Sequence, residues 1–216
     1  MNIPPLKKTY GDRLVLDTPE LELAGGSIYA LIGANGSGKS TLARLIAGIE
    51  PADGKKRLRL SGVGYMPQKS YAFRMSTKAN ILLGGGDDAR CGELMRALQL
   101  EELAGKPAHR LSGGETARMA LARLLMQKYE LVILDEPTAA MDMESSFRAE
   151  ALMTEYVRDA GCAMLLVTHS LQQAKRMADR VLFLDGGVLV EAGDKNAVLY
   201  APQDPRTKRF IDFYGT

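Results

Sequence analysis

The chain has 216 residues, of which 46% are hydrophobic and 25% charged, and its formal net charge at pH 7 is +2. This length and composition are typical of a globular protein with one good-sized core, or with a core and a smaller attached lobe. The small net charge gives no general attraction to nucleic acid, so we expect no nucleic-acid partner. The basic clusters Lys55–Arg57 and Arg206–Arg209 are interpreted as solvated surface.

Cysteine usage and hydropathy bear on the compartment. Cys91 and Cys162 have neither metal-type nor redox-type spacing, which suits buried or half-buried thiols in a reducing compartment. The opening segment, MNIPPLKKTYGD, lacks the apolar core of a signal peptide. No uninterrupted apolar run reaches the roughly 18 residues that a membrane helix needs. We therefore expect a cytoplasmic protein that works at a membrane only by docking to another chain.

The predicted elements alternate between strands and helices along most of the chain. Short apolar runs broken by turn residues predict strands in the first third, and apolar residues at three- and four-residue steps predict the helices. In chain order we expect strands within 12–33, a helix over 38–50, a strand-like segment over 55–68, helices over 75–130, a strand at 131–135, a helix over 145–160, a strand at 163–169, a helix over 170–180, strands within 181–193 and a short helical tail.

This alternation predicts an α/β fold with a mostly parallel sheet. The early strands predict a small N-terminal antiparallel part, and the helical middle predicts an α-helical subdomain inserted into the core. We place the core at 1–68 and 129–216 and the helical subdomain at 69–128, within a single domain of residues 1–216.

The segment GANGSGKST, residues 33–41, fits the pattern G-x-x-x-x-G-K-[ST] between a predicted strand and a predicted helix. Glycines let successive backbone N–H groups point at phosphate oxygens, and the helix N-terminus adds the positive end of its dipole. Lys39 would reach the β- and γ-phosphates, and Ser40 would hold Mg²⁺. The predicted nucleotide contacts in this loop are Gly33, Asn35, Gly36, Ser37, Gly38, Lys39, Ser40 and Thr41.

The buried strand LVILD ends in two carboxylates, Asp135 and Glu136. Asp135 can hold Mg²⁺ beside the phosphates, and Glu136 would be placed to activate a water for in-line attack on the γ-phosphate. Read alone, the pair could be an acidic turn before Pro137. The upstream phosphate loop favours the catalytic interpretation.

The segment LSGGE, residues 111–115, precedes a predicted helix. Ser112 followed three residues later by Glu115 is typical of a capping box. A capped helix start is also a phosphate site, so both interpretations hold together.

The phosphate loop, Gln68 at a strand end, LSGG, Asp-Glu-Pro-Thr and His169 at a strand end follow one another in an order that resembles the ATP-binding subunit of an ABC transporter. The resemblance runs from about Tyr10 to about Gly193, and it implies a P-loop NTPase core with ATP and Mg²⁺ as ligands. LSGG separates this family from other P-loop proteins.

The resemblance implies further roles. Tyr10 would stack on adenine, although a turn aromatic that covers the core is the alternative. Gln68 would sense Mg²⁺ and the attacking water, which gives Ser40, Gln68 and Asp135 as the metal site. His169 would contact the γ-phosphate, whereas His109 matches no motif and is expected at the surface. The implied catalytic residues are Lys39, Gln68, Glu136 and His169.

The resemblance also implies a composite site between two copies of the chain. Ser112, Gly113 and Gly114 would contact the γ-phosphate held by the other subunit, and Asp142 would bridge the subunits. Glu115 stands where the family more often has Gln, and AAMD replaces the commoner Ser-Ala-Leu-Asp. Gln68 follows Lys39 by only 29 residues (68 − 39), so the β part should be trimmed, and so should the helical lobe.

The implied partners are a second copy in a head-to-tail homodimer, or a paired cassette, a transmembrane permease and a solute-binding protein. The permease would dock near residues 69–76, where Tyr71 and Phe73 could be core residues or partly exposed anchors. The chain would be peripheral on the inner face of the cell membrane. A short stand-alone cassette resembles an importer's subunit, for an oxyanion such as tungstate or phosphate, or for a polar amino acid.

Two alternatives stay open at this point. One is a soluble ABC-type ATPase that acts in translation or DNA repair, although such proteins usually carry two cassettes or a long coiled-coil insertion. The other is a degenerate cassette that binds ATP without turnover, against which Glu136 and His169 argue.

Overall fold

The computed structural model describes residues 1–54 and 57–214, so the expectation for Lys55 and Lys56 lies outside the described residues. The strands are β1 (Asn2–Ile3), β2 (Leu6–Tyr10), β3 (Arg13–Thr18), β4 (Leu21–Glu22), β5 (Ile28–Ile32), β6 (Val63–Met66), β7 (Leu131–Asp135), β8 (Ala163–Val167), β9 (Arg180–Asp185) and β10 (Val188–Asp194). The helices are α1 (Lys39–Ile46), α2 (Thr77–Leu82), α3 (Asp88–Ala97), α4 (Gly113–Leu124), α5 (Met143–Ala160), α6 (Leu171–Met177), α7 (Lys195–Tyr200) and α8 (Pro205–Tyr214), with 3₁₀ turns at Glu101–Leu103 and Ala108–Arg110.

The main sheet has eight strands in the order β2-β3-β10-β9-β5-β8-β7-β6. Strands β9, β5, β8, β7 and β6 pair in parallel, and β10–β9 and β2–β3 pair antiparallel. Strands β5, β7 and β8 are buried at every residue, as their continuous apolar runs require in a parallel sheet covered on both faces. The predicted α/β fold with a mostly parallel sheet and antiparallel N-terminal strands is confirmed.

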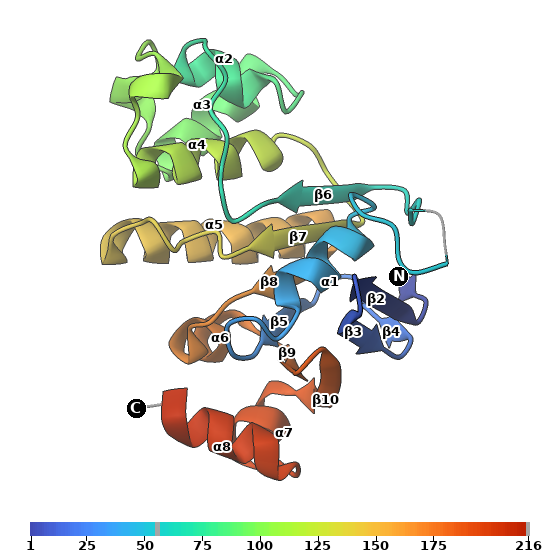
Figure 1. Cartoon of the computed structure of the whole chain (residues 1–216). Helices are drawn as coiled ribbons and strands as arrows, with labels where there is room; N and C mark the ends of the chain where they lie inside the picture. Colours follow the sequence, from blue (N-terminus) through green and yellow to red (C-terminus); the bar gives the residue numbers. More distant parts are fainter. Residues whose placement is uncertain (55–56, 215–216) are drawn as a thin grey trace.

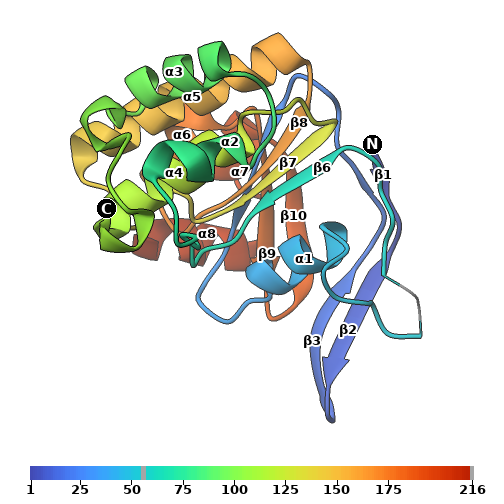
Figure 2. The same ribbon diagram turned by 90° about the horizontal axis from the view of Figure 1, so that it is seen from above.

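Helices cover both faces of this sheet (Figures 1 and 2). Along β7, Leu131 and Ile133 pack on the face that carries α1, and Val132 and Leu134 pack on the face that carries α4 and α5. This alternation follows from the two-residue period of a strand. Helices α6 to α8 add a third apolar cluster over β5 and β9, in which Phe183 stacks on Phe210.

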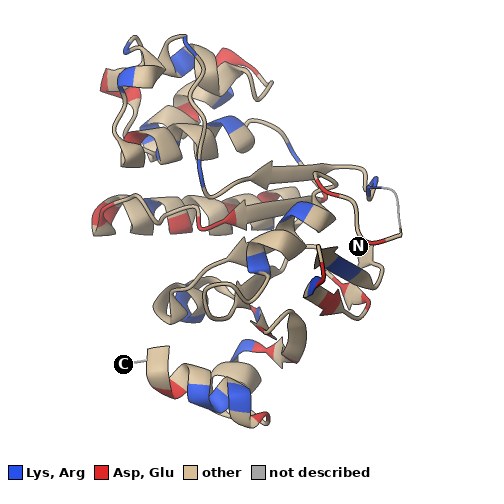
Figure 3. Ribbon diagram, viewed as in Figure 1, with Lys and Arg blue, Asp and Glu red and all other residues tan. Residues whose placement is uncertain are grey.

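The helical middle of the chain forms one group, α2 to α4, that lies together at one side of the sheet (Figure 1). Its apolar residues share a cluster with the sheet face and with α5, and both cysteines are buried in that cluster. Figure 3 shows that acidic and basic residues are both distributed along the ribbon of these helices and of α5. His109 is exposed there, as the sequence predicts.

Several predicted boundaries differ from the structure. Strands β1 and β2 lie before the predicted strands at 12–33, and α1 ends at Ile46 instead of residue 50. The strand-like segment at 55–68 yields a strand only at β6, because a turn at Ser61 and Gly62 precedes it and Gly62 has a positive φ of 61°. Helix α5 begins at Met143, two residues before the predicted start, because Asp142 caps it.

Candidate active site

The loops that carry the predicted site residues meet at one edge of the sheet. Strands β5, β8, β7 and β6 are parallel neighbours, so their carboxyl ends lie along the same edge. Gly33 follows β5, Gln68 lies two residues after β6, Glu136 follows β7, and His169 lies two residues after β8. In open α/β sheets this edge is where ligands bind.

The loop between β5 and α1 requires glycine at two tight positions. Gly33 has a φ of 153°, and a Cβ there would lie 2.1 Å from the carbonyl oxygen of Leu184. Gly38 has a φ of 104°, and its Cβ would lie 2.9 Å from the carbonyl oxygen of Val15. The loop is therefore pressed against β9 and β3, which fixes the curl of its backbone.

Helix α1 begins without a side-chain cap, since its N-cap residue is Gly38. Each of α2 to α7 begins with a Ser or Asp side chain that accepts a backbone hydrogen bond. The first N–H groups of α1 therefore keep their capacity to bind an anion. Lys39 Nζ lies beside them and donates to the carbonyl oxygens of Gly33 and Ala34, at 2.7 and 2.9 Å.

A cavity of about 490 Å³ opens over this helix start. The sequence predicted most of its lining but missed Arg13 and Val15, two residues of β3 whose alternation along the strand was the available signal. The lining residues are Arg13, Val15, Asn35, Gly36, Gly38, Lys39, Ser40, Thr41, Gln68 and Glu136.

Two of the three predicted metal ligands, Ser40 and Asp135, lie together. Ser40 Oγ donates to Asp135 Oδ1 at 3.2 Å, and Asp135 is only 2% exposed. Burial raises the pKa of the Asp135 carboxyl, and the Ser40 hydrogen bond opposes that shift. Burial also lowers the pKa of the nearby Lys39 ammonium, against the attraction of Glu136 and Asp135. The Asp135 carboxyl and the Lys39 ammonium are thus poorly solvated, and opposite charges on a bound ligand would stabilise their charged forms.

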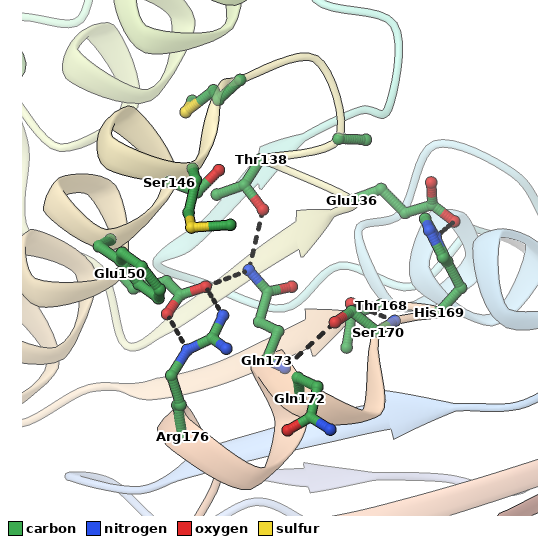
Figure 4. Close-up of a pocket in the computed structure, with 14 residues that line it drawn as sticks. Glu136, Thr138, Ser146, Glu150, Thr168, His169, Ser170, Gln172, Gln173 and Arg176 are labelled. Carbon is green, nitrogen blue, oxygen red and sulfur yellow. Dashed lines mark hydrogen bonds and ion pairs between the residues drawn. The ribbon is translucent and has the colours of Figure 1, made fainter. Parts of the chain in front are cut away.

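Glu136 lies at the centre of a second group of contacts. Its Oε2 accepts a hydrogen bond from Gln68 Nε2 at 2.9 Å, and its Oε1 lies 3.3 Å from His169 Nδ1. The backbone of Glu136 has a positive φ of 50°, uncommon for a residue other than glycine. Figure 4 shows the Glu136 carboxylate and the His169 ring turned toward each other. These two contacts fix the orientation of the Glu136 carboxylate at the cavity.

A polar cluster around the buried side chains of Gln173 and Glu150 supports the loops on either side of Glu136 and His169 (Figure 4). Gln173 Nε2 donates to Thr138 Oγ1 at 2.9 Å and to Glu150 Oε1 at 3.1 Å. Arg176 binds both oxygens of Glu150, at 2.8 and 2.7 Å. Gln173 therefore joins helix α6, which follows His169, to the loop that follows Glu136. The sequence analysis missed this cluster, because the pattern along α6 does not show which residues Gln173 contacts.

The segment LSGGE begins helix α4 as a complete capping box. Ser112 Oγ accepts from the Glu115 N–H at 3.2 Å, and Glu115 Oε2 accepts from the Ser112 N–H at 2.7 Å. Lys106 Nζ lies 3.1 Å from the same Glu115 oxygen. A Cβ at Gly114 would lie 2.8 Å from the carbonyl oxygen of Ala140, so this glycine lets the helix start approach the loop before Asp142.

The remaining predicted residues lie at the margins. Asp142 caps α5, where its carboxylate accepts from the backbone and the hydroxyl of Ser145 at 2.8 and 2.9 Å. Tyr10 ends β2 opposite Arg13 in the strand register, and it is 45% exposed. The structure thus brings together Lys39, Ser40, Gln68, Asp135, Glu136 and His169. Of these, Lys39, Ser40, Gln68 and Glu136 line the cavity over α1, whereas Ser112, Gly113 and Gly114 do not.

The residues at this site fit a nucleoside triphosphate. Ser37 Oγ is buried without a hydrogen-bond partner among the described residues, within a loop whose tight backbone approach depends on glycine. The uncapped helix and Lys39 supply donors for phosphate oxygens. The described residues contain no group of three His, Cys, Asp or Glu side chains that could hold a metal alone. Mg²⁺ does not need one, since it binds one or two protein oxygens and completes its shell with phosphate and water.

Comparison with known proteins places the chain in a family. Residues 16–139 match the family model described as ABC transporter. The chain belongs to this family and is an ATP-binding subunit with ATPase activity.

Three similar proteins are ATP-binding proteins of uptake or import systems. The tungstate uptake system ATP-binding protein TupC of Peptoclostridium acidaminophilum is 39% identical over 209 residues, which are 89% of this chain and 97% of that protein. An aliphatic sulfonates import ATP-binding protein of Rhodococcus jostii is 39% identical over 222 residues, covering 97% of this chain and 81% of that protein. A zinc import ATP-binding protein of Roseobacter denitrificans is 35% identical, over 94% of this chain and 82% of that protein.

A solved structure of the ATP binding subunit of an ABC transporter superposes with a TM-score of 0.84 over 100% of this chain and 99% of that chain, at 21% sequence identity. At this identity the likeness concerns the fold. None of the described helices combines the length and the apolar character needed to cross a membrane.

Proposed function

We propose that two copies of the chain associate head to tail and enclose two ATP molecules between them. The division of the site carries this proposal. Lys39, Ser40 and Glu136 line one cavity, whereas the capped start of α4 at Ser112 does not. In the dimer, Ser112 and Gly114 of one copy would complete the γ-phosphate site of the other, and Asp142 would lie between the copies.

Each residue then has a defined part in hydrolysis. Lys39 and the α1 amides would hold the β- and γ-phosphates, and Tyr10 would stack on adenine. Ser40, Gln68 and Asp135 would hold Mg²⁺, which neutralises phosphate charge when bound. The Glu136 carboxylate would accept a proton from the attacking water. The oxygen of that water would bond to the γ-phosphorus as the bond from phosphorus to the bridging oxygen of ADP breaks. His169 would orient the γ-phosphate.

Hydrolysis would remove the charge that holds the two copies together, and the opened dimer would move a permease. The segment 69–76 is the proposed contact on the permease side. Its aromatics are not core residues, since Tyr71 is 64% exposed and Phe73 43% exposed, with their rings in edge-to-face contact. Exposed aromatics held in one geometry suit an anchor for a partner helix. The chain would therefore be a peripheral protein on the inner face of the membrane.

Import of a small oxyanion is the transport function that we propose. Its support is the similarity to ATP-binding proteins for tungstate and for aliphatic sulfonates, each at 39% identity over most of both chains. The cargo would contact a solute-binding protein and the permease rather than this chain. Stimulation of the ATPase by tungstate, phosphate or a sulfonate in the reconstituted complex would separate these anions.

Complementation between two inactive variants tests the composite site. Glu136→Gln should bind ATP without hydrolysing it, and Ser112→Arg should block the γ-phosphate contact that the partner needs. A mixed dimer contains one site with a native P-loop half and a native LSGG half. Mixing the two variants should therefore restore ATP hydrolysis, measured as phosphate release, to a level well above either variant alone.

The matched control is Asp87→Arg, which alters a side-chain helix cap on α3, outside the proposed contacts. This variant should keep its activity without mixing with a second variant. If mixed Glu136→Gln and Ser112→Arg stayed as inactive as each variant alone, while each folded and bound ATP, the two halves would not combine across a dimer and the proposal would fail.

A further inference from the structure

A hydrogen bond fixes the hydroxyl of Tyr10, while much of the side chain is exposed. Its hydroxyl donates a hydrogen bond to Glu50 Oε2, and Lys8 Nζ lies 5.2 Å from the centre of the ring. Because 45% of Tyr10 is exposed, its ring is not fixed by packing in a core. A platform for a nucleobase needs an accessible aromatic face and a defined orientation. Here the orientation comes from polar contacts.

Glu50 connects this tyrosine to the helix of the phosphate loop. Its second oxygen, Oε1, accepts a hydrogen bond from Arg44 Nε at 2.6 Å. Arg44 Nη2 in turn lies 3.4 Å from Thr41 Oγ1, and Thr41 lines the cavity. A continuous set of contacts therefore runs from Thr41 on α1, through Arg44 and Glu50, to Tyr10 on β2.

The other side of the β2–β3 hairpin also reaches the cavity. Tyr10 pairs with Arg13 in the register, and Arg13 lines the cavity. A second contact joins β2 to the segment after α1, because Lys8 Nζ donates to the carbonyl oxygen of Pro51 at 2.8 Å. The tyrosine thus stands at the cavity margin, and its hairpin is fastened to the segment after α1.

The protonation states suit this arrangement. The Tyr10 hydrogen bond holds the pKa of the Glu50 carboxyl below its ordinary value, and the same bond raises the pKa of the Tyr10 hydroxyl. Both shifts keep the carboxylate as acceptor and the phenol as donor at neutral pH.

We propose that Glu50 is a positioning residue for the nucleobase: by bridging Arg44 and Tyr10, it holds the tyrosine ring where adenine stacks. This inference rests on the proposed function, in which Tyr10 contacts adenine. Glu50 would increase the affinity for the base through Tyr10, whereas the loop that contains Lys39 would provide the affinity for the phosphates.

Two ligands separate these contributions. The dissociation constants of Mg-ATP and of magnesium tripolyphosphate, which lacks the base and sugar, can be measured by calorimetry on the full chain. We expect the native chain to prefer ATP by about tenfold or more, as stacking on one aromatic allows. Glu50→Ala should reduce this preference by about three- to tenfold and change the affinity for tripolyphosphate less than about twofold.

The variants distinguish an action through Tyr10 from a general structural one. Tyr10→Ala should abolish most of the preference, and adding Glu50→Ala to it should cause no further loss. Glu50→Gln keeps the volume of the side chain and should give an intermediate preference. Glu20→Ala is the matched control, since Glu20 is exposed and makes no hydrogen bond or ion pair with the described part of the chain.

Three outcomes would overturn the proposal for Glu50: an unchanged preference in Glu50→Ala, an equal loss of affinity for both ligands, or additive losses in the double variant. An unchanged preference in Tyr10→Ala would instead remove adenine stacking from Tyr10, and with it both this inference and that part of the proposed function. The two failures are therefore recognisably different.

Discussion

The two halves of the proposed composite site are built in different ways. The half around Lys39 and Glu136 draws its residues from the ends of four parallel strands, and its carboxylate Asp135 is almost fully buried. The half around Ser112 is one exposed helix start that satisfies its own polar groups through a capping box. The first half is held by the sheet and keeps unsatisfied binding capacity, whereas the second depends on local hydrogen bonds. Substitutions should therefore separate chemistry from stability in the first half and combine them in the second.

The largest expected effect is in the strand-built half. Glu136→Gln should lower ATP turnover by roughly 10²-fold or more, because the general base is lost, and should keep ATP binding. Steady-state phosphate release and an ATP titration measure the two quantities. Glu130→Gln, at the opposite end of the same strand, is exposed and should leave turnover unchanged. Normal turnover in Glu136→Gln would remove Glu136 from its proposed role.

A smaller effect is expected in the helix-start half. Ser112→Ala removes the cap of α4 and the hydroxyl proposed to contact phosphate, so it should cost about 1 kcal/mol of stability and about tenfold in turnover. Thermal unfolding and phosphate release measure the two losses. Asp87→Ala removes a side-chain cap from α3 and should match the thermal loss alone. If both variants kept full turnover, Ser112 would be a structural cap only.

Substitution of Asp135 should change stability and activity in opposite directions. Burial raises the pKa of its carboxyl, so the charged form is disfavoured in the folded chain without nucleotide. Asp135→Asn should raise the stability of that state by about 0.5–2 kcal/mol at neutral pH, while Mg²⁺-dependent hydrolysis falls. The gain should shrink as the pH falls and Asp135 in the native chain becomes protonated. A lower unfolding temperature for Asp135→Asn at pH 7 would contradict this.

The smallest effect is expected for Glu115→Gln, since Gln can fill the same position of a capping box. Turnover should change less than about twofold at pH 7. The hydrogen bond from the Ser112 backbone lowers the pKa of Glu115, with a contribution from Lys106. A carboxyl whose pKa is lowered by folding stabilises the folded chain at any pH above its unfolded-state pKa. This stabilisation is lost as the pH falls through the folded-state pKa. The difference in unfolding temperature between native chain and variant should therefore narrow at acidic pH, as thermal scans from pH 3 to 7 would show.

The sequence predicted best where a motif adjoined an uninterrupted apolar run. Strands β5, β7 and β8 are such runs, so the placement of Gly33, Glu136 and His169 at one sheet edge followed from strand ends alone. The family and the ATPase activity are confirmed by the match over residues 16–139 and by the relatives. The roles of the individual site residues stay predictions.

Side-chain partners distant in sequence could not be predicted. Gln173 meets Glu150 across 23 residues, and Tyr10 meets Glu50 across 40 residues. Neither pair has a periodic signal, because each depends on how two elements pack rather than on the pattern within one. Arg13 and Val15 alternate along β3, but only the closure of β3 against the phosphate loop shows that their face of the strand meets the cavity.

The contacts of Lys39 have a consequence for how nucleotide enters and leaves. Its ammonium already donates to the carbonyl oxygens of Gly33 and Ala34, so a phosphate must compete with these acceptors. Under the proposed function, binding would be an exchange of partners, and release would return the lysine to its own loop instead of leaving a buried cation without an acceptor. Lys39 would then have oxygen acceptors at every stage of the hydrolysis cycle.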